Sequence, residues 1–297
     1  MPSRRALASV ALPLFLLAGC AKTPPPSQLP NAQAAIDRMR ATTACGHAIT
    51  ADAKIDQFAS QGRVRGELLM LAARPDQLRM DVLVPVQGSV ATLSSDGKRF
   101  ALRDLRNQRY YTGPATACNL ARLTGVPIPS RVLVNLLLGQ GTILKHDAPG
   151  LAAPTLTWSG NGYYVVTVAG TQDATEELHL APRPEDWGKP WAEQRMRVLD
   201  VSVTQRGVLL YHAELDGHLA AKMSDITPTD LALGITASGP FCDAELPRRI
   251  HVEMPAIAQD VLFRYDTVAW NPPIDGDSFI QPTPKDLPLA EVTCEDR

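Results

Sequence analysis

The sequence predicts a mainly β protein with a few helices, built on one strongly curved antiparallel sheet that helices cover. Segments of alternating apolar and polar residues recur between residues 62 and 270, and several are joined by short turns that contain glycine. One helical pattern precedes these strands, and a second lies midway among them. The length of 297 residues permits two domains, but mainly β domains of this size are common. We therefore expect a single domain over residues 31–297.

The strands are predicted from their alternation and from the turns between them. The clearest strand alternates Leu78, Met80 and Val82 with polar residues, so that its apolar side chains share one face. The Asp96-Gly97 pair predicts a hairpin turn. The expected strands and hairpins span residues 62–71, 76–85, 88–104, 108–113, 154–170, 176–182, 195–203, 207–215, 248–255 and 260–270.

A helix is predicted before the first of these strands. Residues 31–43 place Ala35, Ile36 and Met39 on one side at helical spacing. A shorter helical patch is expected at residues 118–123. Amphipathic segments of this kind pack one face on a sheet and leave the other face in solvent.

The segment LTGVPIPSRVLVNLLLGQ, residues 123–140, contains a short and unusually apolar helix. Pro127 and Pro129 prevent a start earlier than about Ser130, and Gly139 provides the stop. The helix is too short to cross a bilayer. An apolar stripe on one side is flanked by further apolar residues, so this helix needs cover on more than one face. The stripe and its flanks consist of Leu133, Leu136, Leu137, Val132, Val134 and Leu138.

The N-terminal residues predict an export signal rather than a membrane span. Residues 1–19 combine a basic start with an apolar stretch that ends in small residues. Their end, Leu-Ala-Gly followed by Cys20, is similar to the bacterial lipobox, whose cysteine is lipidated; the alternative is an ordinary secretory signal. The proline-rich residues 20–30 then form an extended tether. Ala21 in place of aspartate favours a lipid anchor on the periplasmic face of the outer membrane.

Charge and cysteine spacing exclude several kinds of partner. Two of the 29 Lys and Arg residues lie in the signal, which leaves 27 against 31 acidic residues. No basic stripe with interleaved aromatic residues occurs, so nucleic acid is not expected. Cys45, Cys118, Cys242 and Cys294 are too far apart for zinc-type cysteine pairs. An even number of cysteines in an exported chain predicts two disulfides, and three pairings are possible.

No catalytic motif is evident, and we expect neither enzymatic activity nor a cofactor nor a metal. The six histidines include no HExxH pair, and there is no GxSxG segment. A Gly-Gln-Gly at residue 139 lacks the third glycine of a dinucleotide motif and is interpreted as a helix stop. The carboxylate pairs Glu176 with Glu177 and Glu185 with Asp186 are interpreted as solvated groups rather than as an acid and a base.

Several segments taken together resemble the outer-membrane lipoprotein receptor family LolB. They are LTGVPIP at 123–129, LLLG at 136–139, WSGNGYYVVTVAG at 158–170, VPVQGS at 84–89 and LPRRIHVEMPAIAQDVLFRYDTVAW at 246–270. The resemblance covers residues 31–172 and 246–270. Residues 173–245 form an insertion without counterpart in the short receptors, and the tail beyond residue 271 is also extra.

The resemblance implies a LolA/LolB-like fold, which is an incomplete, half-open antiparallel β-barrel covered by helices. Its hydrophobic cavity accepts the acyl chains of a lipoprotein delivered by a periplasmic LolA-like carrier, and the cargo is then inserted into the outer membrane. The apolar helix would act as a lid over this cavity, and the alternative is that its leucines fill a solid core. We expect the acyl-chain cavity to be lined by Leu68, Met70, Leu78, Met80, Val82, Leu93, Leu133, Leu136 and Leu137.

The same resemblance suggests two further features. Val86 would stand at the tip of a membrane-contact loop, where burial of one valine contributes about 1.5 kcal/mol, which aids contact without anchoring; the alternative is an ordinary hairpin. The implied layout also favours one disulfide pairing. A Cys45–Cys118 bridge would tie the two helical covers together, and a Cys242–Cys294 bridge would hold the tail.

A second function is also compatible with the sequence. The chain would then be a monomeric envelope lipoprotein that shares the fold but binds another amphiphile, or that serves as an interaction module through residues 173–245. Trp187 and Trp191 mark either a contact surface or ordinary loop packing. Complementation of a depleted receptor separates the two functions.

Overall fold

One large and mainly antiparallel sheet forms the body of the protein, and strands from opposite ends of the sequence meet at its centre. The computed structural model describes residues 22–59, 62–84 and 88–294. At the centre β1 (Ala48–Ala59) pairs antiparallel with β16 (Gln259–Trp270). The chain therefore closes the middle of its sheet with its last long strand, and the two halves of the sheet extend outward from this pair.

Most neighbours within each half are consecutive strands. Outward from β1 lie β2 (Gly62–Ala73), β3 (Gln77–Val84), β4 (Gly88–Ser95), β5 (Arg99–Asp104), β6 (Arg109–Pro114) and the parallel strand β17 (Leu289–Glu291). Outward from β16 lie β15 (Arg249–Met254), β11 (Val208–Asp216), β10 (Met196–Gln205), β9 (Ala174–Pro182), β8 (Tyr163–Ala169) and β7 (Thr155–Ser159). The exceptions to the consecutive order are β11 beside β15 and β17 beside β6. Short elements are β12 (Leu219–Ala220), β13 (Lys222–Met223), β14 (Glu245–Leu246), α4 (Pro228–Ala232) and the 3-10 turns Pro184–Asp186, Trp191–Glu193 and Pro255–Ile257.

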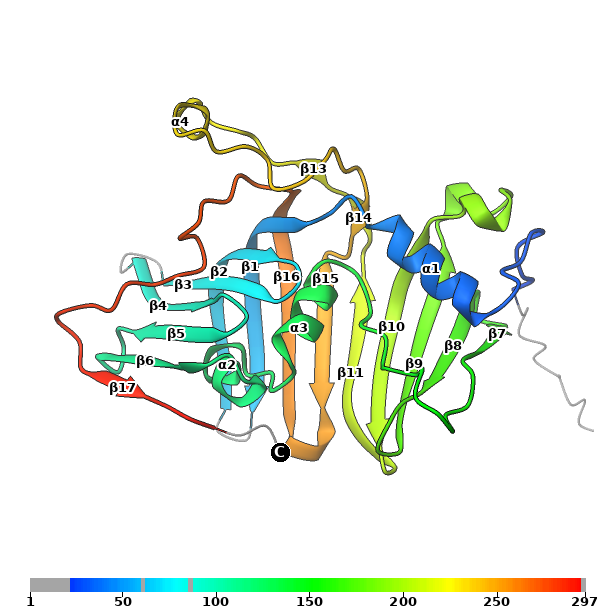
Figure 1. Ribbon diagram of the computed structural model, residues 1–297, viewed down its shortest axis with the longest axis horizontal. Helices are drawn as coiled ribbons and strands as arrows, with labels where there is room; N and C mark the ends of the chain where they lie inside the picture. Colours follow the sequence, from blue (N-terminus) through cyan, green and yellow to red (C-terminus); the bar gives the residue numbers. More distant parts are fainter. Residues whose placement is uncertain (1–21, 60–61, 85–87, 295–297) are drawn as a thin grey trace, which may run out of the picture.

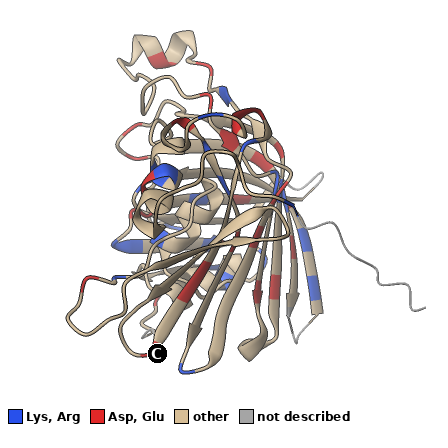
Figure 2. Cartoon of the chain, turned by 90° about the vertical axis from the view of Figure 1, so that its right-hand side faces the viewer, with Lys and Arg blue, Asp and Glu red and all other residues tan. Residues whose placement is uncertain are grey.

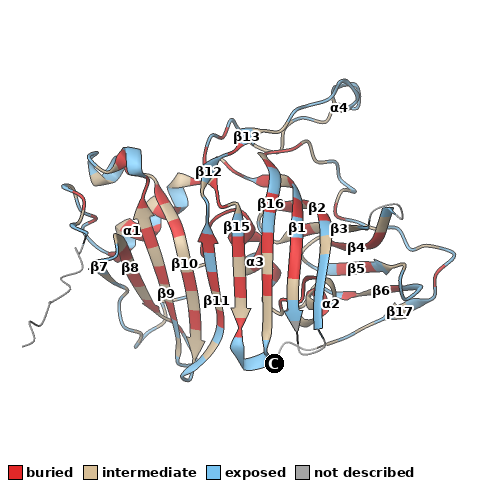
Figure 3. Cartoon of the chain, turned by 180° about the vertical axis from the view of Figure 1, so that it is seen from behind, coloured by how far each residue is buried: buried red, intermediate tan, exposed pale blue. Residues whose placement is uncertain are grey.

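Three helices cover one face of the sheet. Figure 1 shows α1 (Ala32–Thr42) in front of one half, and α2 (Ala117–Thr124) and α3 (Ser130–Leu137) toward the other. α1 contacts β7, β8 and β10, whereas α2 contacts β5 and α3 contacts β2 and β3. Seen from behind, the strands alternate between buried and more exposed residues (Figure 3). The fold class is therefore as predicted: a half-open, mainly antiparallel β structure with helical cover.

The predicted helices are confirmed with small shifts of their ends. The Asn31 side chain caps α1 by accepting a hydrogen bond from the Ala34 N–H at 2.9 Å. α3 starts at Ser130, directly after Pro129, as the prolines require. Gly139 follows with a φ of +74°, a conformation that glycine adopts at little cost. Among the described residues, no helix is both long and apolar enough to cross a membrane.

The central strand β1 is absent from the sequence prediction. Its inward side consists of Ile49, Ala51, Ala53 and Ile55, all of them buried. Because two of these four side chains are alanines, the alternation is weak on a hydrophobicity scale. The small side chains nevertheless suit a strand at the crowded centre of the sheet, where the core packs against both flanking strands.

The disulfide pairing favoured above is wrong. The bonds join Cys45 to Cys242 and Cys118 to Cys294. The expectation placed the first two helices side by side, but α1 lies over β7–β10 and α2 over β5. Cys45 lies just before β1, beside the end of β16. The segment before β14, which contains Cys242, reaches the same place, because the Trp270 indole N–H at the end of β16 donates a hydrogen bond of 2.8 Å to the Ala244 carbonyl. The tail follows β6, so its cysteine reaches α2.

Residues 173–245 contribute to the main sheet. β9, β10 and β11 come from this segment, and β11 pairs with β15 of the C-terminal strand pair. The strands of this segment therefore lie in the sheet between β8 on one side and β15 on the other. Two predicted positions, Cys20 with its lipid anchor and Val86 with its membrane-contact role, lie outside the described residues.

Candidate functional site

A partly enclosed pocket opens between strands β1–β5 and helix α2. Its cavity volume is about 300 Å³. Apolar side chains form its inner wall, and Gly66 leaves room between them, because a Cβ there would lie 3.2 Å from the Val82 side chain. The apolar lining residues are Ile55, Val64, Leu68, Met80, Val82, Val90, Ala91, Leu102 and Leu123. The interior is therefore suited to hydrocarbon rather than to a polar ligand.

Polar side chains stand at the mouth of this pocket. Gln57, Asp104, Arg106, Asn107 and Arg122 contribute to the lining. Asp104 organises the β5–β6 turn, since its side chain accepts hydrogen bonds from the N–H groups of Arg106 at 3.1 Å and Asn107 at 3.0 Å. The Arg122 guanidinium lies 5.5 Å from the centre of the Tyr111 ring, within the range of a cation–π contact. The pocket therefore combines an apolar inner wall with two exposed cations, Arg106 and Arg122, and one half-buried carboxylate, Asp104.

The structure divides the predicted cavity residues into two groups. Leu68, Met80 and Val82 line the pocket. The remaining six lie in the closed hydrophobic core, each 3% exposed or less: Met70, Leu78, Leu93, Leu133, Leu136 and Leu137. Their role in binding an acyl chain stays a prediction. The pocket lies beside the apolar helix, under α2 rather than under α3.

Helix α3 is packed against its surroundings. Leu133, Leu136 and Leu137 are fully buried, and the Tyr265 hydroxyl donates a hydrogen bond of 2.9 Å to the Leu137 carbonyl. The prediction that this helix needs cover on more than one face is therefore confirmed, and the cover is the packed hydrophobic core. Sequence reasoning predicted a helix at residues 118–123 but missed its place beside the pocket, because the contact of α2 with β5 depends on the tertiary structure.

Two carboxylates that were interpreted as solvated are buried. Glu176 is fully buried, and its Oε2 accepts a hydrogen bond from the Leu144 N–H at 2.8 Å. Burial raises the pKa of Glu176 to about 7, although this hydrogen bond acts in the opposite direction. Asp186 is also fully buried; burial acts to raise its pKa, but hydrogen bonds from Arg195 and Lys189 outweigh this and lower it. Neither group lies at the pocket.

Comparison with known proteins supports the fold. No family model and no curated protein matches the chain. A DUF1329 family protein from Desulfovibrio piger superimposes with a TM-score of 0.51 at 8% identity, covering 86% of this chain and 98% of that one. A LolA superfamily protein from Nitrosomonas europaea has a TM-score of 0.45 at 11% identity, with 84% and 98% covered. At such identities the first likeness establishes a common fold and nothing about activity.

Proposed function

We propose that this chain binds the acyl chain of an amphiphile in the pocket between β1–β5 and α2. The observation that carries the proposal is the combination of an apolar inner wall with Arg106 and Arg122 at the rim. Transfer of a chain from water into such a wall stabilises the complex by about 0.8 kcal/mol per CH₂ group. The cations stand where a negatively charged headgroup would remain in solvent. Binding of this kind needs no catalytic step.

We further propose that the protein is a lipid-anchored receptor of the outer membrane, of the LolB kind. The support is the order and spacing of the segments that resemble this family, together with the half-open sheet. In this role it would accept lipoproteins by their acyl chains from a periplasmic LolA-like carrier and insert them into the outer membrane. Cargo moves without nucleotide when the membrane holds the chains more tightly than the protein does.

The volume of the pocket favours a second candidate function. A cavity of about 300 Å³ lies at the low end of the range of about 300–1,000 Å³ that is typical of ligand pockets. It is suited to a single chain, whereas a multiply acylated lipoprotein would require α2 and α3 to move away from the sheet. The chain would then be an envelope protein that binds an amphiphile with one chain.

Filling the pocket tests acyl-chain binding. Val82 and Leu83 are neighbours on β3 and half-buried, but only Val82 lines the pocket. The full chain is titrated with a fluorescent long-chain fatty acid, and co-purified lipid is identified by mass spectrometry. We expect Val82→Trp to weaken binding about tenfold or more, since lost burial of two CH₂ groups already costs about 1.6 kcal/mol. Leu83→Trp serves as the matched control. Equal binding by both variants would end the proposal.

Complementation then distinguishes the two functions. The chain is expressed in a bacterium depleted of its outer-membrane lipoprotein receptor, and growth and lipoprotein localisation are followed. Rescue by the wild type but not by Val82→Trp supports the receptor function. Failure to rescue, with retained fatty-acid binding in vitro, supports the single-chain amphiphile instead.

A further inference from the structure

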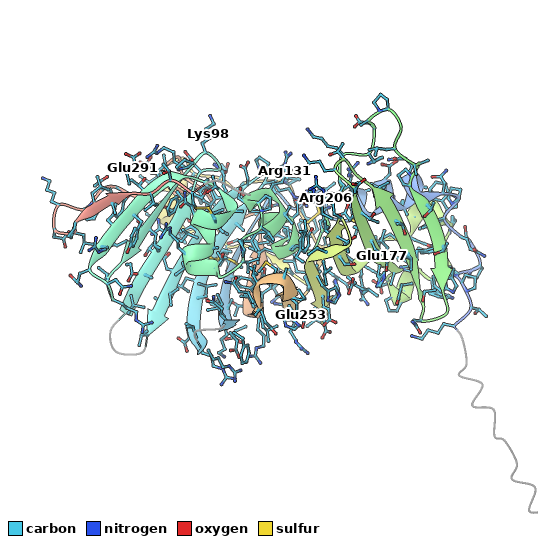
Figure 4. All side chains as sticks on the ribbon, turned by 90° about the horizontal axis from the view of Figure 1, so that it is seen from below. Lys98, Arg131, Glu177, Arg206, Glu253 and Glu291 are labelled. Atoms are coloured by element: carbon cyan, nitrogen blue, oxygen red, sulfur yellow. A yellow bond between two sulfur atoms is a disulfide. The ribbon has the colours of Figure 1, made fainter. Side chains whose placement is uncertain are left out.

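A row of alternating histidines and carboxylates crosses the face of the sheet opposite to the helices. It runs over five neighbouring strands, β9, β10, β11, β15 and β16. We call it the His–carboxylate row, and its members are Glu177, His179, Asp200, His212, Glu214, His251, Glu253 and Asp260. Figure 4, seen from below, shows Glu253 on the opposite side of the sheet from Arg131 of α3. The row is therefore separate from the pocket.

The centre of the row is the imidazole of His212, and both of its nitrogens face carboxylates. Nε2 contacts Asp200 Oδ2, and Nδ1 lies 3.5 Å from Glu253 Oε2. Asp200 extends the row toward β9, since its other oxygen lies 3.9 Å from His179 Nδ1. His179 in turn contacts Glu177 at 2.8 Å through Nε2. The contacts of His212 with Asp200 and Glu253, and that of His179 with Asp200, cross from one strand to the next, whereas Glu177 and His179 lie on the same strand.

The row continues through Glu253 to the last two strands. The second oxygen of Glu253 lies 3.9 Å from His251 Nε2. The same nitrogen of His251 lies 2.7 Å from Asp260 Oδ1, and its Nδ1 lies 3.9 Å from Glu214 Oε2. The imidazoles of His212 and His251 are thus the centres of two neighbouring clusters, with side chains between one sixth and three fifths exposed. Solutes reach both clusters directly.

The row carries an excess of negative charge. Five carboxylates face three imidazoles, so at least two negative charges remain even when every imidazole holds a proton. In the part of the chain that the structure describes, no lysine or arginine forms an ion pair with any of these carboxylates. Figure 2 shows acidic positions along these strands. A divalent cation bound here would balance this charge.

We propose that the His–carboxylate row is a binding site for a divalent transition-metal ion such as Zn²⁺. Two groups of three ligands are available: Asp200 with His212 and Glu214, and His251 with Glu253 and Asp260. One imidazole nitrogen with two carboxylate oxygens is a donor set that zinc accepts, with water in the open position. Hard cations such as Mg²⁺ prefer oxygen alone, so the histidines select against them.

The two groups bring their ligand atoms near one another without placing them at coordination distance. The ligand atoms of each group lie within 4.8 Å of one another. Two ligands of a tetrahedral zinc ion with bonds of about 2.1 Å lie about 3.4 Å apart. Binding therefore requires side-chain movements of about 1 Å or more, which exposed carboxylates can make while the strands keep the backbone fixed. An ion in the first group would link β10 to β11, and one in the second group would link β15 to β16, which would stabilise the pairing of these strands.

Metal titration of the full chain tests the proposal. Zn²⁺ binding is followed by calorimetry at neutral pH with ethylenediaminetetraacetate-stripped protein, and Mg²⁺ is titrated as the comparison metal. We expect binding of Zn²⁺ in preference to Mg²⁺, and a loss of affinity of about tenfold or more in the double variant His212→Gln/His251→Gln. The variant His47→Gln is the matched control, because His47 is exposed and lies outside the row. It is expected to bind as the wild type does.

Further measurements distinguish the loss of metal binding from misfolding of a variant. Glu253→Gln removes the carboxylate shared by the two imidazoles and is expected to weaken Zn²⁺ binding with an unchanged circular dichroism spectrum. Anomalous diffraction at the zinc edge is expected to place the ion between His212 and His251 or beside either one. An absence of Zn²⁺ binding by the wild type overturns the proposal. So does binding that both the double variant and Glu253→Gln leave unchanged.

Discussion

Replacing Glu176 by glutamine tests how the interior of the C-terminal half responds to pH. The folded carboxyl has a pKa of about 7 against an ordinary value of 4.5. The folded state therefore binds more protons than the unfolded chain between these two values, and stability is lost as the pH rises through this window. The full difference corresponds to about 3 kcal/mol, at about 1.4 kcal/mol for each pKa unit. Glutamine keeps the size of the side chain and an acceptor for the Leu144 N–H, but it cannot ionise.

The free energy of unfolding is measured by urea denaturation of both proteins under oxidising conditions. Between about pH 4 and about pH 8 we expect the wild type to lose about 3 kcal/mol relative to Glu176→Gln. Glu193→Gln, which changes an exposed glutamate, provides the control and is expected to follow the wild type. A difference between wild type and Glu176→Gln that stays constant over this range would refute the reasoning, because Glu176 would then have the same pKa in the folded and unfolded states.

Two further predictions concern the covalent links and the apolar helix. Non-reducing peptide mapping is expected to recover the Cys45–Cys242 and Cys118–Cys294 peptides, and peptides that join Cys45 to Cys118 would contradict this pairing. Replacing both Cys45 and Cys242 by serine is expected to cost about 2–5 kcal/mol of unfolding free energy in denaturant titrations. Leu136→Ala is expected to cost about 2–5 kcal/mol, since Leu136 lies on the buried side of α3 and is fully buried. Val132→Ala, at a half-buried position of the same helix, is expected to cost about 1 kcal/mol. Equal small losses in both variants would mean that α3 covers a hollow.

Local patterns predicted most of the elements because their causes are local. The prolines before Ser130 set the start of α3, and Gly139 set its end, without reference to any other part of the chain. Leu78, Met80 and Val82 identified a strand because alternation puts them on one face. β1 shows the limit of this reasoning. Its inward side includes Ala51 and Ala53, whose low hydrophobicity makes the alternation weak. These small side chains are explained only by the crowded centre of the sheet.

The site depended on which elements lie next to each other. Val82 and Leu68 were expected to line a cavity because of the family resemblance, and they do line the pocket. Leu133 was assigned to the same cavity, but α3 packs closely on β2 and β3 and leaves the space to α2. Glu176 was interpreted as solvated from its charge alone, although alternation places it on the same strand face as Leu178 and Leu180, which points into the core.

The sequence by itself determined the class of fold and the positions of the apolar helix and most strands, because propensity, alternation and turn chemistry act over a few residues. Only the tertiary structure decided the disulfide pairing, the place of the pocket and the His–carboxylate row. These depend on the strand order, in which β16 lies between β1 and β15 and residues far apart in the chain become cross-strand neighbours. His212 and Glu253 are 41 residues apart, and no spacing rule connects them before β11 and β15 are paired.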